Sequence, residues 1–304
     1  MSVIDLDLKK NKLKNRLDFI EELIPYIKNY DGETIVIYVD DVILTNPDLL
    51  SKWANDVVLL KRFGANPIIV HSGEKIVEEY FKKFDIEFKV DDGVIITDDS
   101  SIKILEMILK GKISSEIVSA INDAGGSAVG ISGKDGNLIE AKKFRRSRLR
   151  PETNNVQNII DFGFNGKPST ISPEILLMFE DSKSIPVISS IAIGENAETF
   201  YINPIVVGSV ISASLVARMF VIMSDIKGLV TQDGKVNHSV EYGDFQRQKA
   251  TYKLPSLMRD NIAFAFDNHV EVVRIIDAKI PHSLLLNLFT DEKVGSIITQ
   301  YEYN

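Results

Sequence analysis

The stretch "TIVIYVDDVILTNPDLL", residues 34–50, decides the fold. β-branched and aromatic residues fill its first six positions, and a polar turn with Asp40 and Asp41 ends that run. A helix is expected over residues 47–63, and a second apolar strand, "NPIIVH", follows at residues 66–71. A strand, a helix and a strand joined by short connections are typical of a parallel β-α-β unit.

The alternation of helices and strands continues along the chain. Further helices are predicted at residues 74–83, 100–110, 113–124, 204–219, 255–267 and 281–289. Further strands are predicted at residues 127–132, 137–144, 160–171, 185–194, 220–225, 271–277 and 295–299, with a hairpin near 86–97. Residues 144–157 read as a loop because they are polar. The pattern predicts an α/β fold, a three-layer α/β/α sandwich with a mostly parallel central sheet, whose ligands bind beyond the carboxyl ends of the strands.

Composition excludes several classes of protein. The 304 residues include 35 Lys and Arg against 43 Asp and Glu, a net charge of −8. Nucleic-acid binders are expected to be basic, so nucleic acid is not an expected partner. No cysteine is present, and the four histidines show no ligand spacing, so no metal site is expected. No apolar run is long enough for a membrane span, and a cytoplasmic protein is expected.

Several stretches together resemble the acetylglutamate kinases of the amino acid kinase family, from about residue 12 to the end of the chain. They are "DVVLLKRFGANPIIVHSG" (56–73), "EMILKGKISSEIVSAIN" (106–122), "GISGKDGNLIEAKK" (130–143), "IPVISSIAIGENAETFYIN" (185–203) and "IPHSLLLNLFTDEKVGSIIT" (280–299). The resemblance implies a carbamate kinase-like fold. It also implies a reaction in which ATP, with Mg²⁺, phosphorylates the side-chain carboxylate of N-acetyl-L-glutamate in arginine biosynthesis.

The resemblance implies two phosphate-facing loops, and both are altered here. Tyr38 stands where the family has a lysine, and Asp40 and Asp41 stand where it has glycines. The second loop has one glycine where three are expected, in the order His71, Ser72, Gly73 and Glu74. Glycine matters in such loops because backbone amides approach phosphates closely only when no Cβ intervenes.

The substrate side is altered as well. Gly73, Ile95 and Asn203 occupy positions that bind substrate in the family, and Ile95 replaces an arginine that grips the substrate carboxylate. Tyr201 replaces an asparagine that contacts substrate. Ile205 replaces the aspartate that organises the catalytic lysines.

The nucleotide side is the third region that the resemblance identifies. A second catalytic lysine is expected near Met258, where Lys253 and Arg259 are the nearby cations. Four residues after a core strand match the nucleotide-binding segment and could still hold adenosine: Ser224, Asp225, Gly228 and Leu229.

Several features have a plain interpretation beside a functional one. Asp40 and Asp41 could form a solvated turn or bind magnesium, and His71 could be a structural hydrogen-bonding residue or a base. The "GKDGN" segment, residues 133–137, could be a tight connection between strands or a phosphate loop. A basic cluster could be a solvated loop or a docking patch for an acidic partner or phosphate: Arg145, Arg146, Arg148 and Arg150.

Loss of catalysis is the leading hypothesis. Removing one charge-stabilising donor costs roughly 2.7–4 kcal/mol of transition-state stabilisation, and about five such groups are replaced here. The sequence therefore predicts a catalytically degenerate acetylglutamate kinase homologue that serves as a regulatory or scaffolding subunit. One alternative is an active phosphotransferase with an altered site, using Lys253 or Arg259. Another is a protein whose remodelled pocket takes a cationic or apolar small molecule.

Three segments divide the chain. Residues 1–32 are expected to form an amphipathic oligomerisation helix, since apolar residues recur every three or four positions between residues 13 and 27. Residues 33–205 form the lobe on the acetylglutamate side, and residues 206–304 form the lobe on the nucleotide side. The resemblance implies a homo-oligomer, a dimer or hexamer, or a hetero-oligomer with an active paralogue.

Overall fold

The computed structural model of the protein describes residues 21, 23–91, 94–149, 157–180 and 182–301. Its centre is an eight-stranded sheet in the order β14-β16-β15-β11-β1-β2-β8-β5. Neighbouring strands are parallel except for the antiparallel pair β15 and β16. The strands are β1 (Thr34–Val39), β2 (Asn66–His71), β5 (Ala128–Ser132), β8 (Ile185–Ser189), β11 (Met219–Ser224), β14 (Ser239–Glu241), β15 (Val272–Asp277) and β16 (Ser296–Thr299). The predicted α/β architecture with a mostly parallel central sheet is confirmed.

Strand β1 lies in the middle of the sheet because both of its faces are apolar. All six of its residues are buried. Ile35 and Ile37 belong to one hydrophobic cluster and Val36 to the other, as expected where successive side chains point to opposite faces. Parallel strands with such continuous apolar runs are stable only when helices cover both faces.

Helices cover the two faces of the sheet. One face carries α2 (Asp41–Leu44), α3 (Pro47–Arg62), α4 (Glu74–Lys83), α5 (Asp99–Glu106), α6 (Ser114–Asp123) and α11 (Ser283–Phe289). The other carries α7 (Glu174–Glu180), α8 (Pro204–Ser214), α9 (Tyr242–Gln248) and α10 (Ser256–Asp267). Helix α3 begins where predicted, because the Asn46 side chain accepts hydrogen bonds from the amides of Asp48 and Leu49.

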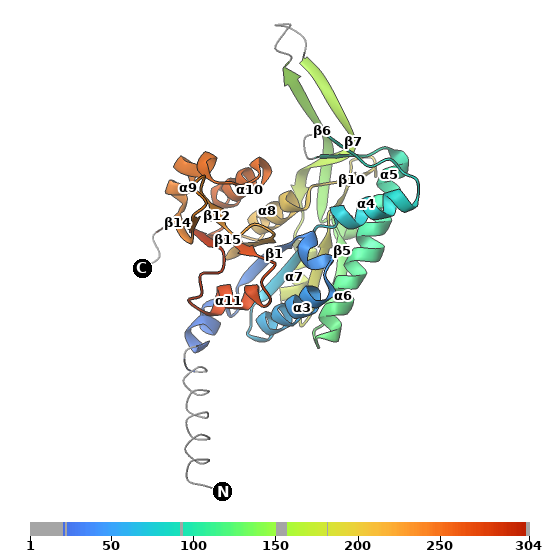
Figure 1. Cartoon of the computed structure of the whole chain (residues 1–304). Helices are drawn as coiled ribbons and strands as arrows, with labels where there is room; N and C mark the ends of the chain where they lie inside the picture. The colour runs from blue at the N-terminus through green and yellow to red at the C-terminus, as the bar shows by residue number, and fades with distance from the viewer. Residues whose placement is uncertain (1–20, 22, 92–93, 150–156, 181, 302–304) are drawn as a thin grey trace, which may run out of the picture.

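A long antiparallel ribbon projects from this body (Figure 1). It consists of β6 (Ile139–Leu149) and β7 (Gln157–Ile171), which close a small barrel with β9 (Ile191–Ile193) and β10 (Thr199–Tyr201). The prediction of a loop over residues 144–157 was therefore wrong at both ends. Arg145, Arg146 and Arg148 lie in β6, and Arg150 lies outside the described residues. Hydrogen bonds between β6 and β7 satisfy the backbone amide and carbonyl groups of these residues. Their polar side chains give no alternating apolar pattern from which a strand could be predicted.

Smaller elements complete the chain. Strands β3 (Lys89–Asp91) and β4 (Val94–Ile96) form the predicted hairpin, and β12 (Leu229–Val230) pairs with β13 (Val236–Asn237). Short helical turns lie at η2 (Asp135–Asn137) and η3 (Lys249–Thr251). The two helices predicted at 100–110 and 113–124 are joined without a break, because η1 (Met107–Ile113) continues the helix as a π-helical turn.

The N-terminal helix is described only from residue 21 onward, without residue 22. Residues 23–30 are helical, and Leu23 and Ile27 pack partly buried against the core. The Tyr26 hydroxyl donates a hydrogen bond to Asp291 at 3.0 Å. This end of the predicted apolar stripe packs within the chain, and the rest lies outside the described residues. Across the described part of the chain, no helix is long and apolar enough to cross a membrane.

Candidate functional site at the carboxyl edge of the sheet

The altered positions gather where β1, β2 and β11 end. Asp40 and Asp41 follow β1, and Ser72 and Gly73 follow β2. The backbone amide of Asp40 donates to Met223 O at 3.1 Å, so this loop also contacts the end of β11. The structure thus brings together both loops that the sequence predicts to face phosphate. This edge is where parallel sheets bind their ligands.

The Asp41 carboxylate lies at the N-terminus of α4. Its Oδ2 accepts a hydrogen bond from the Ser72 hydroxyl at 2.9 Å, and its Oδ1 accepts one from the Lys75 amide at 3.2 Å. Asp41 is only 4% exposed. The solvated-turn interpretation of Asp41 was therefore wrong, because its side chain is buried and satisfies donors of the second loop. A helix N-terminus with free amides favours an anion, and here the protein supplies that anion itself.

One further amide of the second loop and one of α4 are occupied too. The Ser72 amide donates to Val39 O at 2.9 Å, and the Val77 amide of α4 donates to Gly73 O at 2.8 Å. Gly73 has a φ of 150°, a backbone conformation that residues with a Cβ rarely adopt, and a Cβ there would overlap the end of the Ile113 side chain. The backbone conformation, together with packing against the π-helical turn, accounts for the retained glycine.

Burial and mutual repulsion raise the pKa values of the carboxyl groups at this edge. Burial, with the charges of Asp41 and Asp225, raises the pKa of Asp40 from 3.8 to about 6. Burial also raises the pKa of Asp41, against hydrogen bonds from Ser72 and Lys75. Burial, and the charges of the two aspartates, raise the pKa of Glu74 against a hydrogen bond from Tyr201. The edge is therefore acidic and poorly compensated.

Two phenols lie beside these carboxyl groups. The Tyr38 hydroxyl donates to Asp40 Oδ2 at 3.4 Å, and the Tyr201 hydroxyl donates to Glu74 Oε1 at 3.2 Å. Burial, together with the nearby carboxylates, raises the pKa of both phenols well above 10, so both stay neutral donors. A phenol in place of the expected lysine supplies a hydrogen bond without a positive charge.

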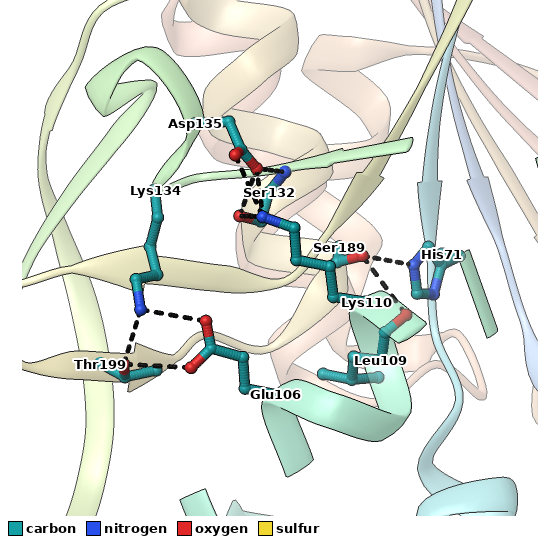
Figure 2. Close-up of polar contacts among 9 residues, drawn as sticks. All are labelled: His71, Glu106, Leu109, Lys110, Ser132, Lys134, Asp135, Ser189 and Thr199. Carbon is teal, nitrogen blue, oxygen red and sulfur yellow. Dashed lines mark hydrogen bonds and ion pairs between the residues drawn. The ribbon is translucent and has the colours of Figure 1, made fainter. Parts of the chain in front are cut away.

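The contacts of His71 are those of a structural hydrogen-bonding residue, because both ring nitrogens have partners within the protein. It is fully buried, and burial lowers its pKa to about 4, so the imidazole is neutral. Its Nδ1 lies 2.7 Å from Ser72 O, which assigns the proton to Nδ1, and its Nε2 lies 3.0 Å from Ser189 Oγ (Figure 2). The imidazole therefore ties the second loop to the end of β8.

Lys110 and Lys134 are each paired with a carboxylate (Figure 2). Lys110, in the π-helical turn, lies 2.7 Å from Asp135, whose carboxylate also accepts from Ser132. Lys134 lies 3.0 Å from Glu106 and donates to Thr199. The "GKDGN" segment connects β5 to β6, as one interpretation predicted, and its charged residues are engaged in these pairs.

The substrate-side positions surround a cavity of about 430 Å³ between the barrel and helices α8 and α10. Ile95, Tyr201 and Asn203 line it together with Glu74. The Asn203 side chain caps α8 by accepting from the Ile205 amide at 3.0 Å, so it is already engaged. The other lining residues are Phe144, Asn165, Gly166, Lys167, Pro168, Ile202, Val206, Val210, Leu257, Asp260, Asn261 and Phe264.

The remaining predicted positions lie in packed surroundings. Ile205 and Met258 are buried in the same core cluster, which suits apolar side chains. Arg259 donates to Leu254 O at 3.0 Å, and Lys253 is exposed. None of the hydrogen bonds or ion pairs of the described residues joins either cation to the carboxyl groups described above.

The predicted nucleotide-side segment is tightly packed as well. Gly228 has a φ of 124°, and a Cβ there would overlap the Ser296 hydroxyl. Leu229 is buried, and its amide donates to Ser296 Oγ at 2.8 Å. Ser224 is buried and accepts from the Ile226 amide, while Asp225 is exposed. A larger cavity of about 530 Å³ lies at β14 and α9 and includes none of these four residues.

Sequence reasoning missed Ser189 and Ser190. Like Asp40 and Ser72, they lie where a parallel strand, here β8, ends at the carboxyl edge of the sheet, and polar residues at that edge are candidates for ligand binding. Ser190 is fully buried, and its hydroxyl has no hydrogen-bond partner within the described chain. The strand-end rule alone could have identified them.

No cluster of metal ligands accompanies this edge. Within the described ranges, no group of three or more His, Asp or Glu side chains is placed to hold a metal ion. Asp41 faces Ser72 and α4, whereas Glu74 faces Tyr201. The acidic side chains thus point to different partners and share no common centre.

Known proteins with similar sequences and structures identify the lineage. Residues 33–269 match the model of the amino acid kinase family. The acetylglutamate kinase of Rhodospirillum rubrum is 37% identical over 92% of this chain and 91% of its own length. That of Saccharophagus degradans is 35% identical over 94% of this chain and 95% of its own.

Solved structures agree on the fold. An N-acetylglutamate synthase from Neisseria gonorrhoeae, complexed with coenzyme A and N-acetyl-glutamate, has a TM-score of 0.78 at 20% identity. That match covers 94% of this chain and 64% of that one. A carbamate kinase from Giardia lamblia has a TM-score of 0.59 at 10% identity, covering 88% of this chain and 98% of that one. The chain therefore belongs to the amino acid kinase family, as an acetylglutamate kinase-like member.

Proposed function

We propose that this chain is a non-catalytic relative of the acetylglutamate kinases that serves as a regulatory or scaffolding subunit in the cytoplasm. The observation that carries the proposal is the Asp41 carboxylate at the N-terminus of α4. It accepts from Ser72 and from the Lys75 amide, which a phosphate would otherwise be free to use. An internal anion in that position competes directly with a bound triphosphate.

Electrostatics support the same conclusion. A carboxylate about 4 Å from a phosphate oxygen repels it by roughly 4 kcal/mol at an effective dielectric constant near 20. Asp40 and Asp41 both lie at this edge, and Tyr38 offers no charge to offset them. The exposed Lys75 acts on Asp41 only through its charge and its backbone amide. Transfer of a phosphoryl group depends almost entirely on such charge neutralisation.

ATP and Mg²⁺ are the groups that kinases of this kind use, and the residues present do not suit them. The amides of Asp40, Ser72 and Lys75 already donate within the protein, and among the described residues the carboxylates do not converge on one point. The segment around Ser224 and Gly228 packs on Ser296. These residues therefore do not suit a bound nucleotide with its metal ion.

A subunit role is supported by what the chain retains. The apolar core on both faces of the sheet is complete, so the fold persists without the catalytic groups. The apolar stripe of residues 13–27 matches the position of an oligomerisation helix in the resemblance. Association with copies of this chain, as a dimer or hexamer, or with an active paralogue is the corresponding proposal.

A coupled assay of ADP release tests the loss of catalysis. The full chain is mixed with ATP, Mg²⁺ and N-acetyl-L-glutamate, with the Rhodospirillum rubrum acetylglutamate kinase as the positive control. We expect turnover at least about a thousandfold below the control, because several charge-stabilising groups are replaced. Circular dichroism of the same sample verifies that it is folded. Turnover within about tenfold of the control would refute the proposal.

A further inference from the structure

The cavity beside Glu74 has apolar walls and an acidic inner end. Ile95, Phe144 and Val206 are among its lining residues, as are Leu257 and Phe264 from other elements. Helices α8 and α10 and the barrel strands thus contribute apolar side chains to one space of about 430 Å³. Cavities of this size and character bind small organic molecules through burial of their apolar part.

The charges around this cavity favour a cation over an anion. Glu74 lines the cavity, and the negative charges of Asp40 and Asp41 act on it. Lys167 and Asp260, which also line it, are exposed and opposite in sign. No ion pair of the described residues gives Glu74 a positive partner. A partly buried carboxylate without such a partner is stabilised when a cation binds beside it.

A narrow crevice adjoins the cavity and shares Glu74, Ile95 and Tyr201 with it. The crevice has no room for a water-sized molecule, so a ligand in the cavity does not reach the buried Ser190 hydroxyl that lines the crevice. The Glu74 carboxylate is therefore the group that a ligand head group would meet.

We propose that this cavity binds an apolar primary amine, with the hydrocarbon part against α8 and α10 and the ammonium group hydrogen-bonded to the Glu74 carboxylate. The proposal concerns binding only and does not rest on the loss of phosphoryl transfer. An active kinase with this cavity would still be expected to take the amine.

Matched probes distinguish the head group from the apolar part. Phenylbutylamine, phenylbutanol and phenylbutanoate share one hydrocarbon framework and differ in charge. Isothermal titration calorimetry on the full chain at neutral pH gives their affinities. We expect the amine to bind at least about tenfold more tightly than the alcohol, and the carboxylate more weakly than either. Equal affinity for all three, or preference for the carboxylate, would overturn the proposal.

Two variants locate the site. Glu74→Gln keeps an acceptor for Tyr201 but removes the charge, so the amine should lose about tenfold in affinity while the alcohol is unchanged. Retained binding of the alcohol also proves that the variant is folded. Glu79→Gln, on the exposed side of the same helix, is the matched control and should change neither affinity. Loss of amine affinity in Glu79→Gln as large as in Glu74→Gln would contradict the assignment.

The apolar part of the site is tested separately. Val210 lines the cavity from α8 and is partly exposed, so Val210→Phe fills space without disturbing the buried core. It should weaken the amine and the alcohol by the same factor, about tenfold or more. Amine binding that survives this change unaltered would place the ligand elsewhere and overturn the proposal.

Discussion

Asp40 and Asp41 are neighbours in the chain, yet their side chains have different partners. Asp41 turns toward α4 and is held by Ser72 and the Lys75 amide, whereas Asp40 faces Tyr38 and the charge of Asp225. The replacement of the expected glycines is visible in the sequence. The partner of each carboxylate is not, because it depends on how closely two loops from different strands approach.

Asp40→Asn should stabilise the protein at neutral pH. The pKa of Asp40 is about 6 in the folded chain and 3.8 ordinarily, so the protonated form favours the fold. The contribution of protonated Asp40 to the free energy of unfolding is present below about pH 4 and is lost as the pH rises through 6. The variant should therefore be more stable at pH 7 by about 1–3 kcal/mol, with little difference at pH 4.

Urea denaturation at both pH values measures this effect. Asp48→Asn is the control, since Asp48 is exposed in a pair with Lys52 and should change stability little at either pH. Asp56, whose pKa burial also raises to about 6, keeps part of the pH dependence in every variant. An Asp40→Asn variant that is less stable than the parent at pH 7 would contradict the argument.

Asp41→Ala should open the N-terminus of α4 to a free anion. Removing the carboxylate leaves the Ser72 hydroxyl and the Lys75 amide without their acceptor. Inorganic phosphate at about ten times its Kd would then raise the melting temperature of this variant by about 2 °C or more, because it binds only the folded state. The parent chain and Asp48→Ala should show no such shift. A phosphate-dependent shift of equal size in all three proteins would disprove the internal-anion model.

At the scale of elements, β7 shows what a local pattern cannot predict. Gly163 lies in its middle with a φ of 71° and bridges to Thr97, and its amide donates to Asp161 at 2.8 Å. The strand signal covers only residues 160–171, whereas β7 begins at Gln157. Residues 157–159 are in the strand because they pair with β6. Such pairing depends on a neighbouring strand and not on the local sequence pattern.

Gly163→Ala should destabilise the protein strongly. A Cβ there would overlap the Thr97 carbonyl oxygen, and the left-handed backbone adds its own strain. Gly234 is a matched control, because its φ of 87° is similar but nothing lies within 4 Å of its Cβ position. Chemical denaturation should give a loss of about 1 kcal/mol for Gly234→Ala and about 2–4 kcal/mol for Gly163→Ala. Equal losses would show that backbone strain alone explains both.

At the scale of the whole molecule, one sheet runs through both predicted lobes. Strand β1, from the lobe of residues 33–205, pairs along its length with β11, from the lobe of residues 206–304, between Ile35 and Met219 at one end and Val39 and Met223 at the other. The alternation of apolar strands and helices made this α/β architecture predictable. The strand order, the position of β14 and helix α9 were not predictable, since short elements with mixed composition give weak local signals.

The shared sheet predicts one cooperative unfolding transition. Trp53, the only tryptophan of the chain, is buried in α3 and reports on the lobe of residues 33–205. Circular dichroism reports on the helices of both lobes. Thermal unfolding followed by the two signals should give the same midpoint, because neither lobe keeps its half of the sheet alone. A fluorescence midpoint several degrees from the dichroism midpoint would indicate that the lobes unfold separately.

The position of the Asp41 carboxylate has a further consequence for how the protein responds to its surroundings. The Asp41 carboxylate, which competes with free phosphate for the N-terminus of α4, is part of the chain and is never diluted. Its local concentration stays at roughly millimolar or above in any solution. A fluctuating pool of free phosphate therefore gains access to α4 only when α2 moves away from it. Displacement of one short helix, rather than metabolite abundance, would govern whether this pocket ever admits a phosphorylated molecule.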